Sequence, residues 1–206
     1  MIQVFSKLEP QDGLASLYDL MKSNRQNVQI VAEIAIANHE KIPPQKVIEM
    51  FEGFGAFDGL YYFLGHILPH TDDKDIYFKY ITSAAKLGKV EEIEKVIRNS
   101  TNYDAEKVKE FLMDAKLPDP RPLIYLCDTH GYVEELTRYL FKNKLNRFIE
   151  IYVFKVNPDA APKVLGTLID LDCDEIYVKQ VLNSIQKCPI EDLVNEFTKR
   201  HKLRLL

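Results

Sequence analysis

The sequence predicts an all-α fold, an α-α superhelix (solenoid) in which antiparallel helical hairpins stack as a single segment over residues 1–206. Three observations lead to this prediction. Apolar residues recur with a helical period, prolines and glycines lie where helices would begin and end, and a glycine-led motif repeats 43 residues apart. Repeats of about 34 to 47 residues that hold two helices each are typical of solenoids, in which each unit packs only against its neighbours.

The helical period is the first observation. Apolar residues at positions i, i+3, i+4 and i+7 form one stripe along a helix. Four such stripes begin at Leu60, Tyr77, Val108 and Val178. From stripes of this kind we expect about 12 helices, most of them about 10 to 15 residues long.

One segment combines two signals. Residues 148–156 are rich in strand-forming side chains, yet they also carry a helical stripe, and no other segment supplies a strand partner. We therefore expect a helix there. Ile151 and Phe154 would lie outside the stripe, so this helix is expected to be apolar on two sides and buried between neighbours on both.

Helix boundaries are the second observation. Pro43 and Pro44 suit the first turn of a helix. Asp104 is placed to cap the helix that follows it, and Pro189 to open the last helix. The segment 118–122 contains three prolines and is expected to be a connection, because proline and the residue before it disfavour a helix interior.

The repeat is the third observation. The run GKVEEI from Gly88 recurs as GYVEEL from Gly131, 43 residues later, and a looser copy starts at Gly55, 33 residues before Gly88. A fourth copy is expected near Asp174, where the pattern is too degraded to assign. We predict that Gly55, Gly88 and Gly131 are structural repeat turns. Gly88 and Gly131 should adopt the left-handed conformation that ends a helix, so Gly131→Val should destabilise the fold.

Composition restricts the class of protein. With 46% hydrophobic residues, 28% charged residues and a net charge of −4, the chain is neither a disordered segment nor a basic nucleic-acid binder. No apolar run approaches the roughly 20 residues of a membrane span, and residues 1–7 lack the order of a signal peptide. The three cysteines (Cys127, Cys173 and Cys188) are odd in number and widely spaced, which favours reduced thiols in the cytosol.

The sequence motifs that could indicate a nucleotide, calcium or anion-binding site are weak. The glycine-rich run 53–59 follows no strand and departs from the dinucleotide spacing, so a helix-connecting turn is expected. Asp170, Asp172 and Asp174 alternate like the start of a calcium loop, but the later loop positions do not fit, and Asp174 is expected to cap a helix instead. The basic run 199–204 is a weak candidate for anionic lipid or an acidic partner.

Cysteine and histidine spacings are equally weak. Cys127 and His130 stand three residues apart but lack the second pair of a structural zinc site. His39 and Glu40 lack the second histidine of a metalloprotease helix. No serine lies in a nucleophile-elbow motif. We therefore expect no enzyme: no catalytic residues, no cofactor-binding residues and no metal site.

Long runs in the chain are similar to the clathrin heavy-chain family. They include GLYYFLGHI (59–67), YFKYITSAAKLGKVEEIEKV (77–96), YDAEKVKEFLMDAKL (103–117), PLIYLCD (122–128), FIEIYVFKVNPDAAPKVLGTLIDLDCDE (148–175) and VNEFTKRHKLRLL (194–206). The resemblance covers essentially the whole chain. It implies an ankle or distal-leg segment built of helical-hairpin repeats, acting as a structural component of coated pits and coated vesicles in endocytosis and vesicle transport.

The resemblance also implies partners. The segment would contact other clathrin heavy-chain legs in a lattice, on the cytosolic face of coated membranes. Light chains and adaptors would bind the full-length protein mainly outside this segment. We expect no nucleic-acid partner, no direct membrane insertion and a monomeric fragment. Because apolar Leu203, Leu205 and Leu206 close the chain without a polar cap, we expect it to be an internal fragment of a longer chain.

An alternative function stays open from the sequence alone. A helical-repeat module of another vesicle-trafficking or tethering complex would capture a peptide or protein in a groove. Such a module should expose a contiguous apolar or one-signed patch larger than a few hundred Å². An enzyme would instead show a deep pocket with convergent titratable groups.

Overall fold

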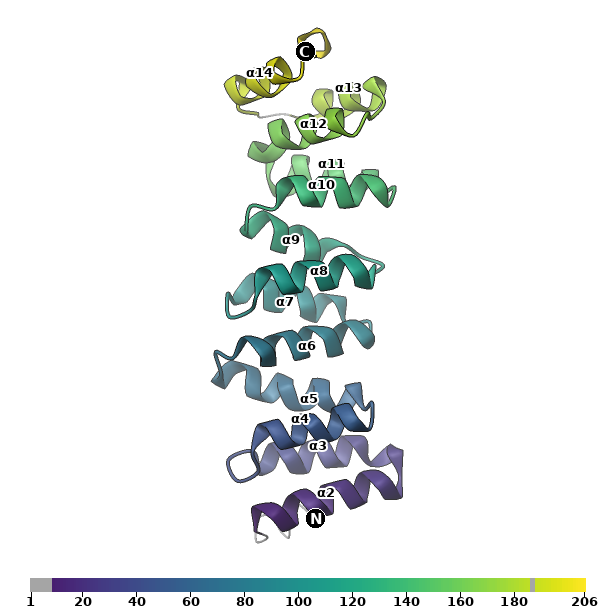
Figure 1. Cartoon of the computed structure of the whole chain (residues 1–206), viewed down its shortest axis with the longest axis vertical. Coiled ribbons are helices and arrows are strands. Elements are labelled where there is room, and N and C mark those ends of the chain that lie inside the picture. Colours follow the sequence, from purple (N-terminus) through teal and green to yellow (C-terminus); the bar gives the residue numbers. More distant parts are fainter. Residues whose placement is uncertain (1–8, 186–187) are drawn as a thin grey trace. The chain divides into compact units, whose positions relative to one another are not determined.

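The computed structural model describes residues 9–185 and 188–206, and within these ranges the chain is helical, with thirteen α-helices and no strand (Figure 1). The expectation of an all-α helical-repeat fold is confirmed. Residues 1–7, in which the sequence shows no signal-peptide order, lie outside the described residues. The chain divides into two compact units, Met1–Phe111 and Leu112–Leu206. A single solenoid segment over residues 1–206 stays a prediction.

From residue 9 onward, the first unit contains six complete α-helices. They are α2 (Pro10–Ser23), α3 (Val28–Ala37), α4 (Pro44–Gly53), α5 (Phe57–Ile67), α6 (Lys74–Lys86) and α7 (Val90–Asn99). Helix α5 packs on α3, α4 and α6, while α6 also packs on α7. Packing thus joins helices that are adjacent or next but one in the chain, which is how a helical repeat forms a continuous core.

The predicted stripes form that core. The α5 residues Leu60, Phe63 and Leu64 are each no more than 2% exposed. Helix α3 is apolar on most of its surface, and five of its ten residues are buried, because it lies between α2 and α5. Pro44 occupies the first turn of α4, as the sequence predicted.

Helix α8 (Ala105–Ala115) contains residues of both units. Its first turn is capped as predicted, because the Asp104 carboxylate accepts hydrogen bonds of 3.1 Å from the amides of Glu106 and Lys107. These bonds stabilise the ionised carboxylate and lower the pKa of Asp104, the bond from Lys107 most strongly.

The described part of the second unit contains six further α-helices. They are α9 (Arg121–Thr129), α10 (Val133–Lys142), α11 (Asn146–Ile151), α12 (Ala161–Asp170), α13 (Glu175–Ser184) and α14 (Ile190–Lys199). Helix α10 packs on α9, α11 and α12, and α12 also packs on α13 and α14. The connection predicted over residues 118–122 ends sooner, because Arg121 and Pro122 already form the first turn of α9, where proline is tolerated.

The segment 148–156 is helical, as predicted, but α11 continues as one π-helical turn, η3 (Tyr152–Val156). A π turn widens the helix and shifts the direction of the residues that follow it. The expectation of burial on two sides is wrong for Phe154, which is 44% exposed. The inner stripe is retained, with Tyr152 1% and Val153 0% exposed.

A polar contact holds this π turn against α9. Asp128, in the last turn of α9, accepts a hydrogen bond of 2.8 Å from the Tyr152 hydroxyl and one of 2.6 Å from the Asn157 side-chain amide, both at Oδ1. A carboxylate at a helix C-terminus faces the negative end of the helix dipole, so it needs such donors. Burial, followed by the hydrogen bond with Asp128, raises the pKa of the Tyr152 hydroxyl, which therefore stays protonated as a donor.

Candidate functional site

The three glycines predicted as repeat turns all have a left-handed backbone, with φ of 61° at Gly55, 68° at Gly88 and 75° at Gly131. They connect α4 to α5, α6 to α7 and α9 to α10. After Gly88, the Lys89 amide donates to the Ala84 carbonyl at 2.9 Å, and the same bond closes the other two turns at 2.9 and 2.8 Å. This is the Schellman arrangement, which satisfies the last carbonyls of the ending helix.

Three further turns have the same backbone hydrogen bonds, although a residue other than glycine occupies the left-handed position. The left-handed residues are Lys144 (φ 58°), Asp172 (φ 53°) and His201 (φ 53°). The amide after each one donates to the carbonyl five residues earlier, at 2.8, 3.1 and 3.0 Å respectively. Asp172 lies 41 residues after Gly131, close to the expected fourth copy of the motif. The turn geometry is therefore present where the glycine is not.

Two other glycines allow helices to approach closely, and sequence reasoning missed them. A Cβ atom on Gly59 would lie 2.8 Å from a Val28 methyl group and closer still to the Phe51 ring, so α5 needs glycine to pack on α3 and α4. A Cβ atom on Gly166 would lie 2.9 Å from the Arg200 guanidinium. Neither role is visible in the sequence, because the contacting residues are distant along the chain.

The basic run 199–204 is neutralised within its own unit. Arg200 donates to Asp170 through Nε (2.7 Å) and Nη2 (2.6 Å), and through Nη1 to Glu196 (2.6 Å). Glu175 accepts from Lys202 at 3.1 Å and from Arg204 at 2.6 Å.

The pKa values of these carboxyl groups respond to the pairing. Hydrogen bonds from Arg200 lower the pKa of Asp170, and Lys199 followed by Arg200 lowers the pKa of Glu196. The run therefore binds α14 to α12 and α13. The weak alternative of a site for anionic lipid or an acidic partner is not supported, because the positive charges already have carboxylate partners.

The calcium-like and zinc-like patterns do not converge. Asp174 caps α13, accepting from the Ile176 amide at 2.9 Å as predicted, and Asp170 is bound to Arg200. Cys127 is fully buried. Within residues 9–185 and 188–206, no three His, Cys, Asp or Glu side chains are grouped to hold one metal ion.

The glycine-rich run 53–59 is a helix connection. Helix α4 ends at Gly53 and α5 begins at Phe57. The run thus supplies one Schellman turn, at Gly55, and one close helix contact, at Gly59. The sequence prediction of a connecting turn is confirmed.

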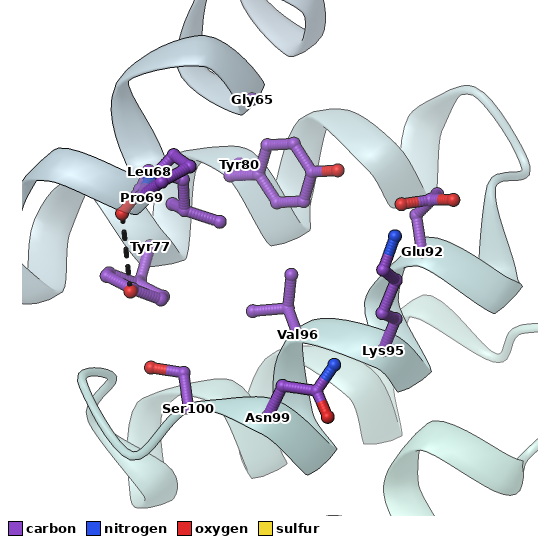
Figure 2. Close-up of a pocket in the computed structure, with 10 residues that line it drawn as sticks. All are labelled: Gly65, Leu68, Pro69, Tyr77, Tyr80, Glu92, Lys95, Val96, Asn99 and Ser100. Carbon is purple, nitrogen blue, oxygen red and sulfur yellow. Dashed lines mark hydrogen bonds between the residues drawn. The ribbon is translucent and has the colours of Figure 1, made fainter.

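A hollow of about 330 Å³ lies between α5, α6 and α7 and is the candidate interaction site of the first unit (Figure 2). Its apolar wall consists of Leu68, Pro69, Tyr77, Tyr80 and Val96. Gly65 also lines the hollow, and a Cβ atom there would lie 3.3 Å from the Tyr80 ring.

Polar groups of α7 surround this hollow, contributed by Glu92, Lys95, Asn99 and the neighbouring Ser100. Figure 2 shows the Lys95 ammonium directed towards Glu92 on one side of the opening. The Tyr77 hydroxyl is already used, donating to the Leu68 carbonyl at 3.4 Å. Burial, followed by the hydrogen bond with Tyr61, raises the pKa of Tyr80, so this hydroxyl is neutral at physiological pH. The hollow offers an apolar surface with a mixed-charge rim.

Exposed apolar side chains are dispersed over several helices. Ile30 on α3 is 43% exposed, Tyr62 on α5 is 55% exposed and Ile176 on α13 is 66% exposed. Ile190 and Val194 lie one turn apart on α14 and are 73% and 39% exposed. Among the described residues, none of the helices has the length and apolar character needed to cross a membrane.

The family match and the similar proteins described below all carry clathrin names. Residues 35–176 match the family described as "Clathrin: Region in Clathrin and VPS". Over its whole length the chain is 46% identical to clathrin heavy chain 2 of Oryza sativa subsp. japonica. It is 41% identical to the clathrin heavy chain of Dictyostelium discoideum and to clathrin heavy chain 2 of Homo sapiens. The chain spans only 12% to 13% of the length of these relatives.

Proposed function

This chain belongs to the clathrin family of helical-repeat proteins, and we propose that it forms a structural segment of a clathrin heavy-chain leg. The observation that supports this proposal most strongly is the sequence identity of 41% to 46% with clathrin heavy chains, which extends over 100% of the chain. In this role the segment supports coated pits and coated vesicles mechanically, and thereby endocytosis and vesicle transport. The same similarity favours this role over a peptide-binding module of another trafficking or tethering complex.

The helix connections support the mechanical role. Gly55, Gly88 and Gly131 end their helices with the same pair of backbone hydrogen bonds and the same left-handed residue. We propose that they are the structural repeat turns of one solenoid segment over residues 1–206. In a stack where each repeat contacts only its neighbours, small rotations between adjacent repeats add up to a bend of the whole stack. Such a leg accommodates different curvatures without a hinge.

The partners of this segment follow from the proposed role. It contacts other heavy-chain legs through many individually weak contacts, which a lattice sums into a stable assembly. Light chains and adaptors bind the full-length protein mainly outside this segment. The protein acts on the cytosolic face of coated membranes without inserting into them, binds no nucleic acid, and has no catalytic function. The isolated fragment is monomeric.

Two experiments test this proposal. The full-length protein that contains this chain, tagged at its native locus, should be enriched in purified coated vesicles and in coated pits; exclusion from both would overturn the coat assignment. Sedimentation velocity of the 206-residue chain at low micromolar concentration should show a monomer. Closed stable oligomers would instead indicate a self-sufficient interface, against the weak contacts proposed for the leg.

A further inference from the structure

Three histidines of the first unit, His39 and the pair His66 and His70, lie together at one end of α3 and α5. His39 follows the end of α3, His66 lies in the last turn of α5, and His70 ends the short helix η2 (Leu68–His70). The ring centroids of His39 and His66 are 5.2 Å apart with the rings at 78°, and those of His66 and His70 are 6.3 Å apart. The packing of α3 on α5 brings His39 and His66 together.

The hydrogen bond of His39 determines which ring nitrogen holds the lone pair. Its Nδ1 lies 2.8 Å from the carbonyl oxygen of Ile36. A carbonyl oxygen only accepts, so Nδ1 carries the proton and donates it, and Nε2 of the neutral ring keeps its lone pair. Metal-binding histidines are held in the same way, with one ring N–H donated to a backbone carbonyl and the other nitrogen bound to the metal.

The space beside these rings has room for an ion and its water ligands. A hollow of about 460 Å³ is lined by residues 36–41 together with His66. Two charged side chains, Glu40 and Lys41, contribute to its lining and offset each other. The Asn38 side chain is engaged elsewhere, since its amide donates to the Ile34 carbonyl at 2.8 Å. Among the neutral side chains that line this space, those of His39 and His66 carry the strongest metal-binding group, an imidazole nitrogen.

We propose that His39 and His66 together bind one borderline divalent transition-metal ion through imidazole nitrogen, with water completing the coordination. The described residues offer no preformed group of three metal-binding side chains, so this is a two-histidine site, weaker than a structural zinc centre. Cu²⁺ should bind more tightly than Ni²⁺ or Zn²⁺, following the general order of divalent affinities. The sequence alone predicts no metal site here, because His39 and His66 are 27 residues apart.

Calorimetric titration of the untagged chain with CuCl₂ and with ZnCl₂ at pH 7.5 tests the site. We expect one ion per chain and an affinity for each metal that falls at least tenfold in His39→Ala and in His66→Ala. His201→Asn in the second unit is the matched control and should leave the affinity unchanged. Circular dichroism of each variant checks that the fold is retained.

A spectroscopic readout separates this pair from other donors. Electron paramagnetic resonance of the Cu²⁺ complex should show coupling to two imidazole nitrogens, and to fewer in each single variant. Failure of the chain to bind Cu²⁺ at 0.1 mM would overturn the proposal. So would binding that His39→Ala leaves intact while His70→Ala abolishes it, because the ligands would then be the histidines four residues apart at the end of α5. Equal loss in the His201→Asn control would also overturn it.

Discussion

Gly59 of α5 faces Phe51 of α4 so closely that a Cβ atom on Gly59 would lie 2.4 Å from Cε1 of the phenyl ring. The same Cβ atom would lie 2.8 Å from the Val28 side chain of α3. Phe51 and Phe63 are both fully buried beside it, so neither ring has space into which to move. The contact between three helices of the first unit therefore depends on one missing methyl group.

Gly59→Ala should lower the free energy of unfolding by about 2 kcal/mol, because overpacking of a rigid core exceeds the gain in helix propensity. Gly53→Ala is the matched control, since a Cβ atom at Gly53 would have no neighbour within 4 Å. That control should be neutral or stabilising by about 0.5 kcal/mol. Urea denaturation monitored by circular dichroism measures both. Equal effects of the two substitutions would show that α5 is free to shift.

Gly131→Val should destabilise the second unit by about 2 kcal/mol, because a β-branched residue is strained at φ of 75°. No atom lies within 4 Å of the added Cβ position, so the cost is conformational rather than steric. Lys144 has the same turn geometry with φ of 58°, and Lys144→Gly should stabilise by about 0.5 to 1 kcal/mol. Thermal unfolding should therefore show a lower midpoint temperature for Gly131→Val and a higher one for Lys144→Gly than for the native chain. A neutral Gly131→Val variant would contradict the assigned turn.

These turns show how far the sequence could predict the fold. Helix positions and the turns at Gly88 and Gly131 were predictable, because apolar period and glycine placement are local signals. The turn at Asp172 was not, because a left-handed conformation costs an ordinary residue only about 1 kcal/mol and needs no glycine. Its hydrogen bonds match those of the glycine turns, so geometry preserves the pattern that the sequence has lost.

Contacts between distant segments were the part that sequence reasoning missed. The basic run at the end of the chain is bound by carboxylates, including Asp170, about 30 residues earlier. Gly59 and Gly166 matter because of what packs against them, and nothing in their own neighbourhood along the chain indicates it. The π turn that directs Phe154 outward likewise depends on a backbone detail that the apolar period does not encode.

Arg200→Ala should destabilise the second unit by about 1 to 2 kcal/mol, because Arg200 makes a bidentate contact with Asp170 and a further one with Glu196. The difference in unfolding free energy between the native chain and Arg200→Ala should be smaller in 1 M NaCl, because salt screens partly exposed charges. Lys46→Ala is the control: the exposed Lys46–Glu49 pair should contribute no more than about 0.5 kcal/mol.

The same contact predicts a pH dependence. Arg200 lowers the pKa of Asp170 in the folded chain below its unfolded value of about 3.9. The contribution of the pair is therefore complete above about pH 4 and is lost as the pH falls through the folded pKa. Unfolding free energies of the native chain and of Asp170→Asn should differ at pH 7 and converge in acid. A constant difference down to pH 2 would indicate that the Asp170 charge is not involved.

Tyr152→Phe should lower the free energy of unfolding by about 1.5 to 3 kcal/mol, because it removes a part-buried hydrogen bond to the Asp128 carboxylate. Tyr62→Phe on α5 is the control, since Tyr62 is 55% exposed, and it should change stability by less than about 0.5 kcal/mol. Urea denaturation at pH 7.5 compares the two.

The Tyr152 hydroxyl also makes the difference in unfolding free energy between the native chain and Tyr152→Phe depend on pH. This difference is lost at high pH, whereas the contribution of Asp170 is lost at low pH. Burial raises the folded pKa of Tyr152 above its unfolded value of about 10. Its contribution is thus complete below about pH 10 and declines as the pH rises towards the folded pKa, since the unfolded chain loses the proton first. The advantage of the native chain over Tyr152→Phe should therefore narrow as the pH rises above about 10. If the advantage widened instead, the folded chain would stabilise the phenolate form of Tyr152, and the hydrogen bond assigned from its hydroxyl to Asp128 would be wrong.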